Sequence, residues 1–137
     1  MGTQLQIIQA VMDIVGAVSG IREAPDYPPE QLGDFPFAVA FPGEGTHSFG
    51  VVGERKFLGN VVLEIHVSRV ALPIAVENSI GFGDTIPNAL LASPTLNGAA
   101  DVFESVVQTF GELNWGDTQT LGFRFIVTNI KARTNIT

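Results

Sequence analysis

The sequence FLGNVVLEIHVSRV, residues 57–70, decides the fold because it carries the clearest alternating pattern in the chain. Successive side chains of a β-strand point to opposite faces of its sheet. One set is wholly apolar and is expected to face the core: Val61, Leu63, Ile65 and Val67. The other set is expected to face solvent or a partner: Val62, Glu64, His66 and Ser68. This segment therefore predicts a long strand with one buried face.

The residues before this strand are rich in glycine and proline. Glycines recur through residues 43–60, which predicts a flexible hairpin with short strands near 46–52 and a tip around Gly53 to Lys56. Phe35 to Phe41 is predicted as a separate strand. Pro36 cannot donate a ladder hydrogen bond, so the start of that strand is expected at a sheet edge or outside the sheet.

Two more strands are predicted near the end of the chain. Residues 101–113 fit a helix by spacing, but their β-branched and aromatic side chains favour a strand from about 103. A turn is expected at Trp115 and Gly116. Alternation then predicts a last strand from Leu121 to about Ala132, followed by a loose tail over 133–137.

Helical spacing covers residues 3–19, with Thr3 as the N-cap and a stop at Gly20 or earlier at Gly16. The apolar stripe comprises Leu5, Ile8, Val11, Met12, Val15 and Val18. Ile7 and Ile14 lie off this stripe. They indicate either that the helix contacts two neighbours or that its core face is broad.

Residues 22–34 read as an acidic, proline-containing loop, and residues 73–82 as a helix that restarts at Pro87 and runs through Leu91. The whole chain, residues 1–137, is expected to be a single domain. Its fold class is α+β: a mixed or antiparallel sheet with a long β-hairpin, packed against two helices.

The composition is unusually apolar for so small a domain. Hydrophobic residues make up 45% and charged residues 15%, against roughly 25% charged in ordinary soluble domains. A small domain exposes much of its surface and needs polar residues to cover it. We therefore expect part of the apolar surface to face another protein, as in an obligate assembly.

The charge balance and the missing cysteines exclude several functions. The formal net charge is −7, which argues against tight binding to nucleic acid or to anionic lipid. The absence of cysteine excludes disulfides and thiolate chemistry. The apolar segment from Leu5 to Val18 is interrupted by polar residues and is too short to span a bilayer, so no membrane association is expected.

Candidate chemistry is sparse. Glu64 and His66 share one strand face and could form a metal site or an oriented base, but we favour an exposed polar face. The other histidine, His47, falls in the predicted hairpin. The glycine pairs lack the lysine of a phosphate loop and the third glycine of a dinucleotide site. We therefore expect no enzyme activity, no cofactor and no metal.

Aromatic residues offer two further candidates. Phe35, Phe37 and Phe41 lack the interleaved cations of a base-stacking platform, so a core role is favoured. Trp115 is interpreted either as an interface anchor or as a core residue.

Several segments resemble the tail terminator, or tail-completion, proteins of long-tailed phages, a family that includes minor tail protein U. The similarity is carried by DFPFAVAF at residues 34–41, LEIHV at 63–67, IPNALL at 86–91 and PTLNG at 94–98. It extends over nearly the whole chain, and its motifs are structural rather than catalytic.

The resemblance implies a structural virion protein at the head–tail junction, assembled in the host cytoplasm. It implies a homo-oligomeric ring of six subunits that caps the tail tube, ends its polymerisation and contacts a neck or head-completion protein, while DNA passes through the lumen without specific binding. The expected interface residues are Ile7, Ile14, Phe35, Phe37, Phe41, Phe49, Val51 and Trp115.

Three alternatives remain at this point. The chain could be a neck, stopper-like head-completion or tube-like subunit of the same virion. It could be a small ligand-binding or enzymatic α+β domain with a pocket near Glu64 and His66. It could also bind nucleic acid, which the acidic balance disfavours.

Overall fold

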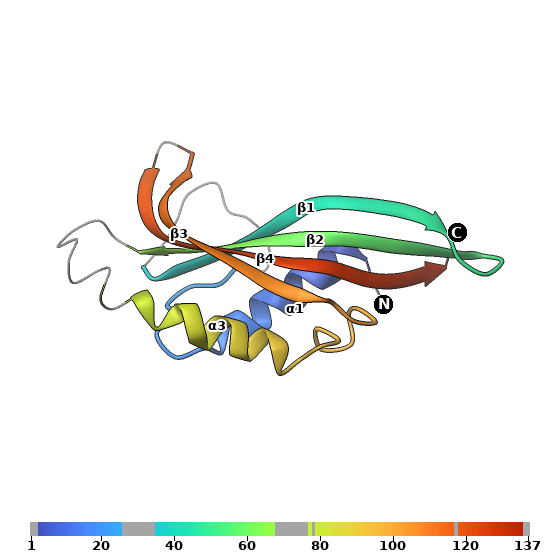
Figure 1. The fold of residues 1–137 in the computed structure, drawn as a ribbon, viewed down its shortest axis with the longest axis horizontal. Coiled ribbons are helices and arrows are strands. Elements are labelled where there is room, and N and C mark those ends of the chain that lie inside the picture. Colours follow the sequence, from blue (N-terminus) through green and yellow to red (C-terminus); the bar gives the residue numbers. More distant parts are fainter. Residues whose placement is uncertain (1–2, 26–34, 68–76, 78, 117, 136–137) are drawn as a thin grey trace.

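The computed structural model describes residues 3–25, 35–67, 77, 79–116 and 118–135. Over these residues the chain forms a four-stranded antiparallel sheet with strand order β1-β2-β4-β3, covered on one face by two helices (Figure 1). The α+β class is therefore confirmed. The elements are α1 (Gln4–Gly16), β1 (Phe37–Phe49), β2 (Glu54–Val67), α3 (Phe82–Leu91), β3 (Ser105–Trp115) and β4 (Thr118–Asn135).

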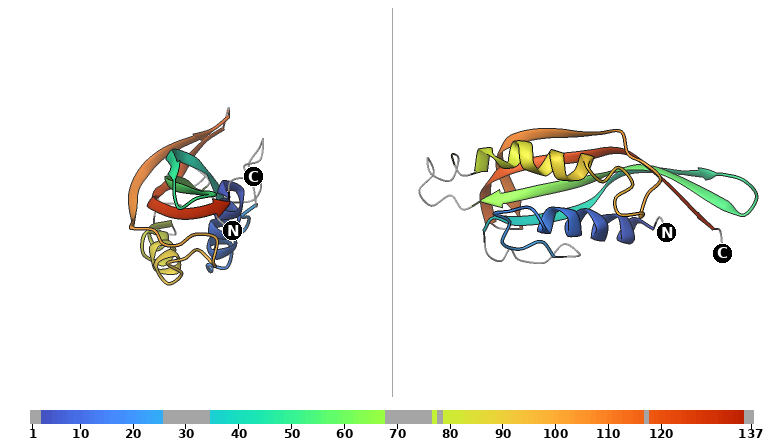
Figure 2. Two further views of the ribbon diagram at one scale, coloured as in Figure 1. Left: turned by 90° about the vertical axis from the view of Figure 1, so that its right-hand side faces the viewer. Right: turned by 90° about the horizontal axis from the view of Figure 1, so that it is seen from below.

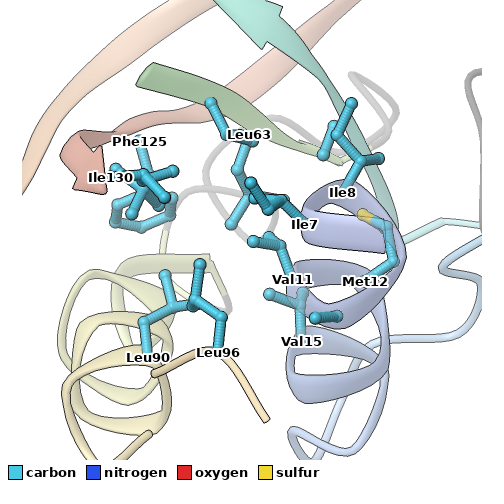
Figure 3. Close-up of a cluster of buried hydrophobic side chains, with 14 of the residues drawn as sticks. Ile7, Ile8, Val11, Met12, Val15, Leu63, Leu90, Leu96, Phe125 and Ile130 are labelled. Carbon is cyan, nitrogen blue, oxygen red and sulfur yellow. The ribbon is translucent and has the colours of Figure 1, made fainter. Parts of the chain in front are cut away.

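The two inner strands, β2 and β4, show the predicted alternation. Leu63 lies opposite Phe125 and Ile65 opposite Phe123, and all four side chains are buried beneath the helices. Figure 3 shows Leu63 and Phe125 in one cluster with side chains of α1, such as Ile7, and of α3, such as Leu90. Because each fully buried side chain of this size contributes about 1.5–3 kcal/mol, this face is the main source of stability.

Helix α1 begins where the sequence predicts. The Thr3 hydroxyl accepts a hydrogen bond from the Gln6 backbone N–H, and the Gln6 side-chain oxygen accepts one from the Thr3 backbone N–H, which forms a capping box. The helix ends at Gly16. Most of the predicted stripe is buried, but Leu5 is exposed, and Ile7 is fully buried. The broad core face is therefore the correct interpretation for Ile7.

The second helical region is interrupted at a different place from the one predicted. Ile80 is helical, the chain turns at Gly81, and α3 then runs without a break through Pro87 to Leu91. Gly81 interrupts the helix because glycine has the lowest helix propensity of any residue except proline. Pro87 lies in the second turn of α3, where it removes one hydrogen bond without ending the helix. Residues 73–76 and 78 lie outside the described residues.

The strands reach well beyond the helices. The predicted strands near 35–41 and 46–52 are one continuous strand, β1, with a bulge between Pro42 and Gly45. Proline is tolerated there because β1 is an edge strand. The expected loose tail is also wrong in part, because Arg133 to Asn135 extend β4. Ser68 and residues 26–34 lie outside the described residues.

We call residues 45–58 and 131–135 the arm. Its three strands project past the end of α1, and the β1–β2 turn lies at its far end (Figure 2, right). The structure thus has a layered body and an extension of sheet, whose base still contributes Phe57 and Ala132 to the core.

The other end of the sheet bends away from the helices. Gly111 and Gly122 are paired partners in β3 and β4, and a Cβ at Gly122 would collide with the Ile65 carbonyl. Glycine at this point permits the close strand approach and the bend. Figure 1 shows the β3–β4 turn curling onto the side of the sheet opposite the helices, where Leu113 and Phe37 are buried.

Neither helix of the described residues has the length and apolar character that crossing a bilayer would require.

The fold predicts that Ile65→Asp will unfold the subunit, because Ile65 is fully buried and an unpaired carboxylate there is very costly. The matched control is Val107→Asp in β3, whose side chain is half exposed; its stability should change by less than about 1 kcal/mol. Circular dichroism melting measures both. A cooperative wild-type melt for Ile65→Asp would refute this assignment of the core.

Candidate functional site

The polar pair on β2 lies inside the molecule, which corrects the expectation of an exposed face. Glu64 is 2% and His66 0% exposed. Both are on the sheet face opposite the helices, and the ring of Trp115 approaches that of His66 edge-on at 6.3 Å between centroids. The curled end of the β3–β4 pair therefore covers a face that the sequence pattern alone assigns to solvent.

Two residues of β4 join the pair to form a continuous polar network. Thr120 is hydrogen-bonded through Oγ1 to His66 Nδ1, and His66 Nε2 lies 3.0 Å from Glu64 Oε1. Arg124 donates from Nε and Nη2 to Glu64 Oε2 at 3.0 and 2.8 Å. Arg124 is 47% exposed, so the network runs from a buried hydroxyl to the surface.

Glu64 is the charged centre of this network. Burial by itself raises its pKa, but hydrogen bonds from His66 and Arg124, with the electrostatic attraction of both, outweigh burial and hold the pKa below 4.5. The ionised carboxylate accepts a hydrogen bond from His66 Nε2, and the other ring nitrogen, Nδ1, shares a second hydrogen bond with the Thr120 hydroxyl.

A hydroxyl, an imidazole and a carboxylate in this order resemble the parts of a nucleophilic triad. The Thr120 side chain is only 1% exposed, however, so a substrate has no approach to its hydroxyl in this conformation. Among the described residues, no buried side-chain nitrogen or oxygen lacks a hydrogen-bond partner. The closed, satisfied network is suited to fixing the curled β3–β4 end onto β2.

The second histidine is not part of this network. His47 lies on the arm and its ring packs against Phe57, with 5.1 Å between centroids. Within the part of the chain that the structure describes, no group of three or more His, Cys, Asp or Glu side chains is placed to hold a metal.

The predicted interface residues fall into three groups. Ile7 and Phe37 are buried within the subunit, so they are corrected to core residues. Ile14, Phe35, Phe41 and Trp115 are half-buried, and Trp115 packs against Phe41 at 5.8 Å between centroids. Phe49 and Val51 are exposed.

The exposed pair belongs to an apolar cluster at the end of the arm. The exposed fractions are 88% for Phe49 and 70% for Val51, and Val52 is fully exposed. Phe49 ends β1, and Val51 and Val52 lie in the β1–β2 turn, away from the core. Exposed apolar clusters are characteristic of interaction sites, which makes this one a candidate.

Sequence reasoning missed Thr120, Arg124 and Val52. Arg124 was detectable in part, because it occupies the outward set of the last alternating strand. Its pairing with Glu64 depends on strand order β2-β4, which the pattern does not give.

No protein family model matches this chain, and no curated protein matches it significantly. Its function must therefore be inferred from its own sequence and geometry.

The pKa of Glu64 predicts a defined pH dependence. Because the folded pKa lies below the ordinary value of 4.5, ionised Glu64 stabilises the fold above about pH 4.5, and this contribution is lost as pH falls through the folded pKa. Glu64→Gln should cost about 1–3 kcal/mol at pH 7, a range that allows for the exposure of Arg124. The deficit should shrink towards pH 3 in urea unfolding.

Glu44→Gln is the matched control, since Glu44 is exposed and has no ion pair among the described residues. Its unfolding free energy should follow the wild-type curve at every pH. An equal deficit for Glu64→Gln at pH 7 and pH 3 would show that the network does not depend on the ionised carboxylate.

Proposed function

We propose that this chain is a structural virion subunit of the tail-terminator type, which caps a phage tail tube as a ring and forms the junction to the neck. The observation that carries the proposal is the arm with its exposed apolar end. An enzyme has no need for an extension of uncovered sheet, whereas an assembly subunit needs a surface that a neighbour will bury.

The sheet edges support assembly into a ring. β1 and β3 are the two edges of the sheet, and they are different surfaces of the same subunit. Unpaired edges are available for contacts with other chains. A contact between two different surfaces of identical subunits is heterologous, and it closes into a ring when the rotation permits.

The remaining features fit the same role. The chain has few charges for its size, and exposed apolar side chains also occur on the β3 edge at Val107 and Phe110. The proposed partners are five further copies, the tail tube protein and a neck protein, with DNA passing through the lumen unbound. The half-buried Phe35, Phe41 and Trp115 are candidates for the contacts between copies.

A role in the adjacent neck or tube of the same virion would use the same surfaces. These roles differ in the ring to which the chain binds. A catalytic role at Glu64 and His66 has one specific observation in its favour, the order Thr120–His66–Glu64. The burial of Thr120 makes this the weaker candidate.

The proposal predicts that the triple variant Phe49→Ser, Val51→Ser, Val52→Ser will fold normally but lose at least tenfold in affinity for tail tubes of the virus that encodes this chain. Three exposed side chains contribute to docking and not to the core. Co-sedimentation with tubes measures binding, and electron microscopy shows whether tube ends are capped.

The control is Leu91→Ser, which removes a similarly exposed side chain from α3. It should bind tubes like the wild type. Undiminished capping by the triple variant would contradict the role of the arm, and binding to a head-completion ring alone would reassign the chain to the neck.

A further inference from the structure

The cations of this acidic protein are concentrated on the arm. Of the seven Lys and Arg residues, four lie there: Arg55, Lys56, Lys131 and Arg133. The chain as a whole has a net charge of −7. The arm is therefore a basic extension of an acidic molecule.

Three of these cations share the face of the arm that continues the sheet face opposite the helices. Lys56 lies directly opposite Arg133, and Lys131 lies two residues from Arg133 on the same face. Like charges placed directly opposite each other destabilise a sheet unless an anion lies between them. Arg133 donates to Asp101 at 2.9 Å, whereas Lys56 and Lys131 have no ion pair among the described residues.

These side chains surround a hollow. Its volume is about 430 Å³, and its lining combines the cations Lys56, Lys131 and Arg133 with Asp101, the aromatic Phe57 and three neutral residues. A concave cationic surface of this kind fits carboxylates presented by a partner.

The helical layer has the opposite character. Neither α1 nor α3 contains a Lys or Arg, while α1 presents Asp13 and α3 presents Asp84, both exposed. A second hollow, of about 330 Å³, lies beside α1 and is lined by Gln6, Gln9, Asp13 and Asn97 among others.

We propose that the basic face of the arm binds the acidic helical layer of a second copy of this chain. The two surfaces lie on opposite sides of the sheet, so the contact repeats head to tail, as a closing ring requires. The inference rests on the proposed ring and names the contact that holds it. The net negative charge of the chain favours a protein partner over nucleic acid.

The test is self-association of the full chain, measured by sedimentation equilibrium in 0.05 M and 0.5 M salt. The wild type should associate at least tenfold more weakly in high salt, because exposed charges are screened. Lys56→Glu should weaken association at least tenfold in low salt. Arg22→Glu, the same charge change on an exposed residue away from the arm, should have no effect.

A charge swap identifies the partner surface. Lys56→Glu combined with Asp13→Lys or with Asp84→Lys should restore association, since the attraction is re-formed with reversed signs. Failure of both swaps, or wild-type association by Lys56→Glu, would overturn the contact. A wild-type chain that stays monomeric in low salt would overturn it too, while capping of tubes through the arm end would still stand.

Nucleic acid is the other outcome of the same variants. Binding of a DNA duplex by the wild type that Lys56→Glu abolishes would assign the basic face to phosphates and refute the proposal. We expect no duplex binding by either protein at 0.15 M salt.

Discussion

A mismatch between strand length and helix length shapes this molecule. The 14 residues of β2 span about 46 Å at the rise of an extended chain, whereas the 13 residues of α1 span about 20 Å. A single layer of such helices cannot cover such strands. The body therefore has a helix-covered core, and the rest of β1, β2 and β4 projects as the arm. The apolar side chains at its end are therefore exposed to solvent.

The face of the sheet opposite the helices is covered by the bent end of the β3–β4 pair. Paired glycines let β3 and β4 bend, and the curled end places Trp115 and Leu113 over β2. Glu64 and His66 are enclosed as a result, and Thr120 and Arg124 complete their hydrogen bonds. A polar network that is buried and fully satisfied gives specificity to this arrangement, since removing one member leaves a charge without its partner.

The local sequence pattern predicted most of the helices and strands, but little of how they pack together in the fold. Alternation located β2 and β4, and the Thr3 cap located the start of α1, because both depend on neighbouring residues. The burial of Glu64 could not be predicted, since it depends on a bend some fifty residues away in the sequence. The same holds for Ile7, whose burial depends on where the sheet lies. The basic face of the arm could not be predicted from the sequence, because Lys56 and Arg133 become neighbours only through strand pairing.

We propose that the arm is a docking element, whose length exceeds the helices because a partner binds it. Electron cryomicroscopy of the chain bound to a tail tube would locate the arm directly. We expect a ring of subunits at the tube end, with residues 49–52 of each arm buried against the tube. A complex in which the helical layer faces the tube while the ends of the arms stay in solvent would contradict it.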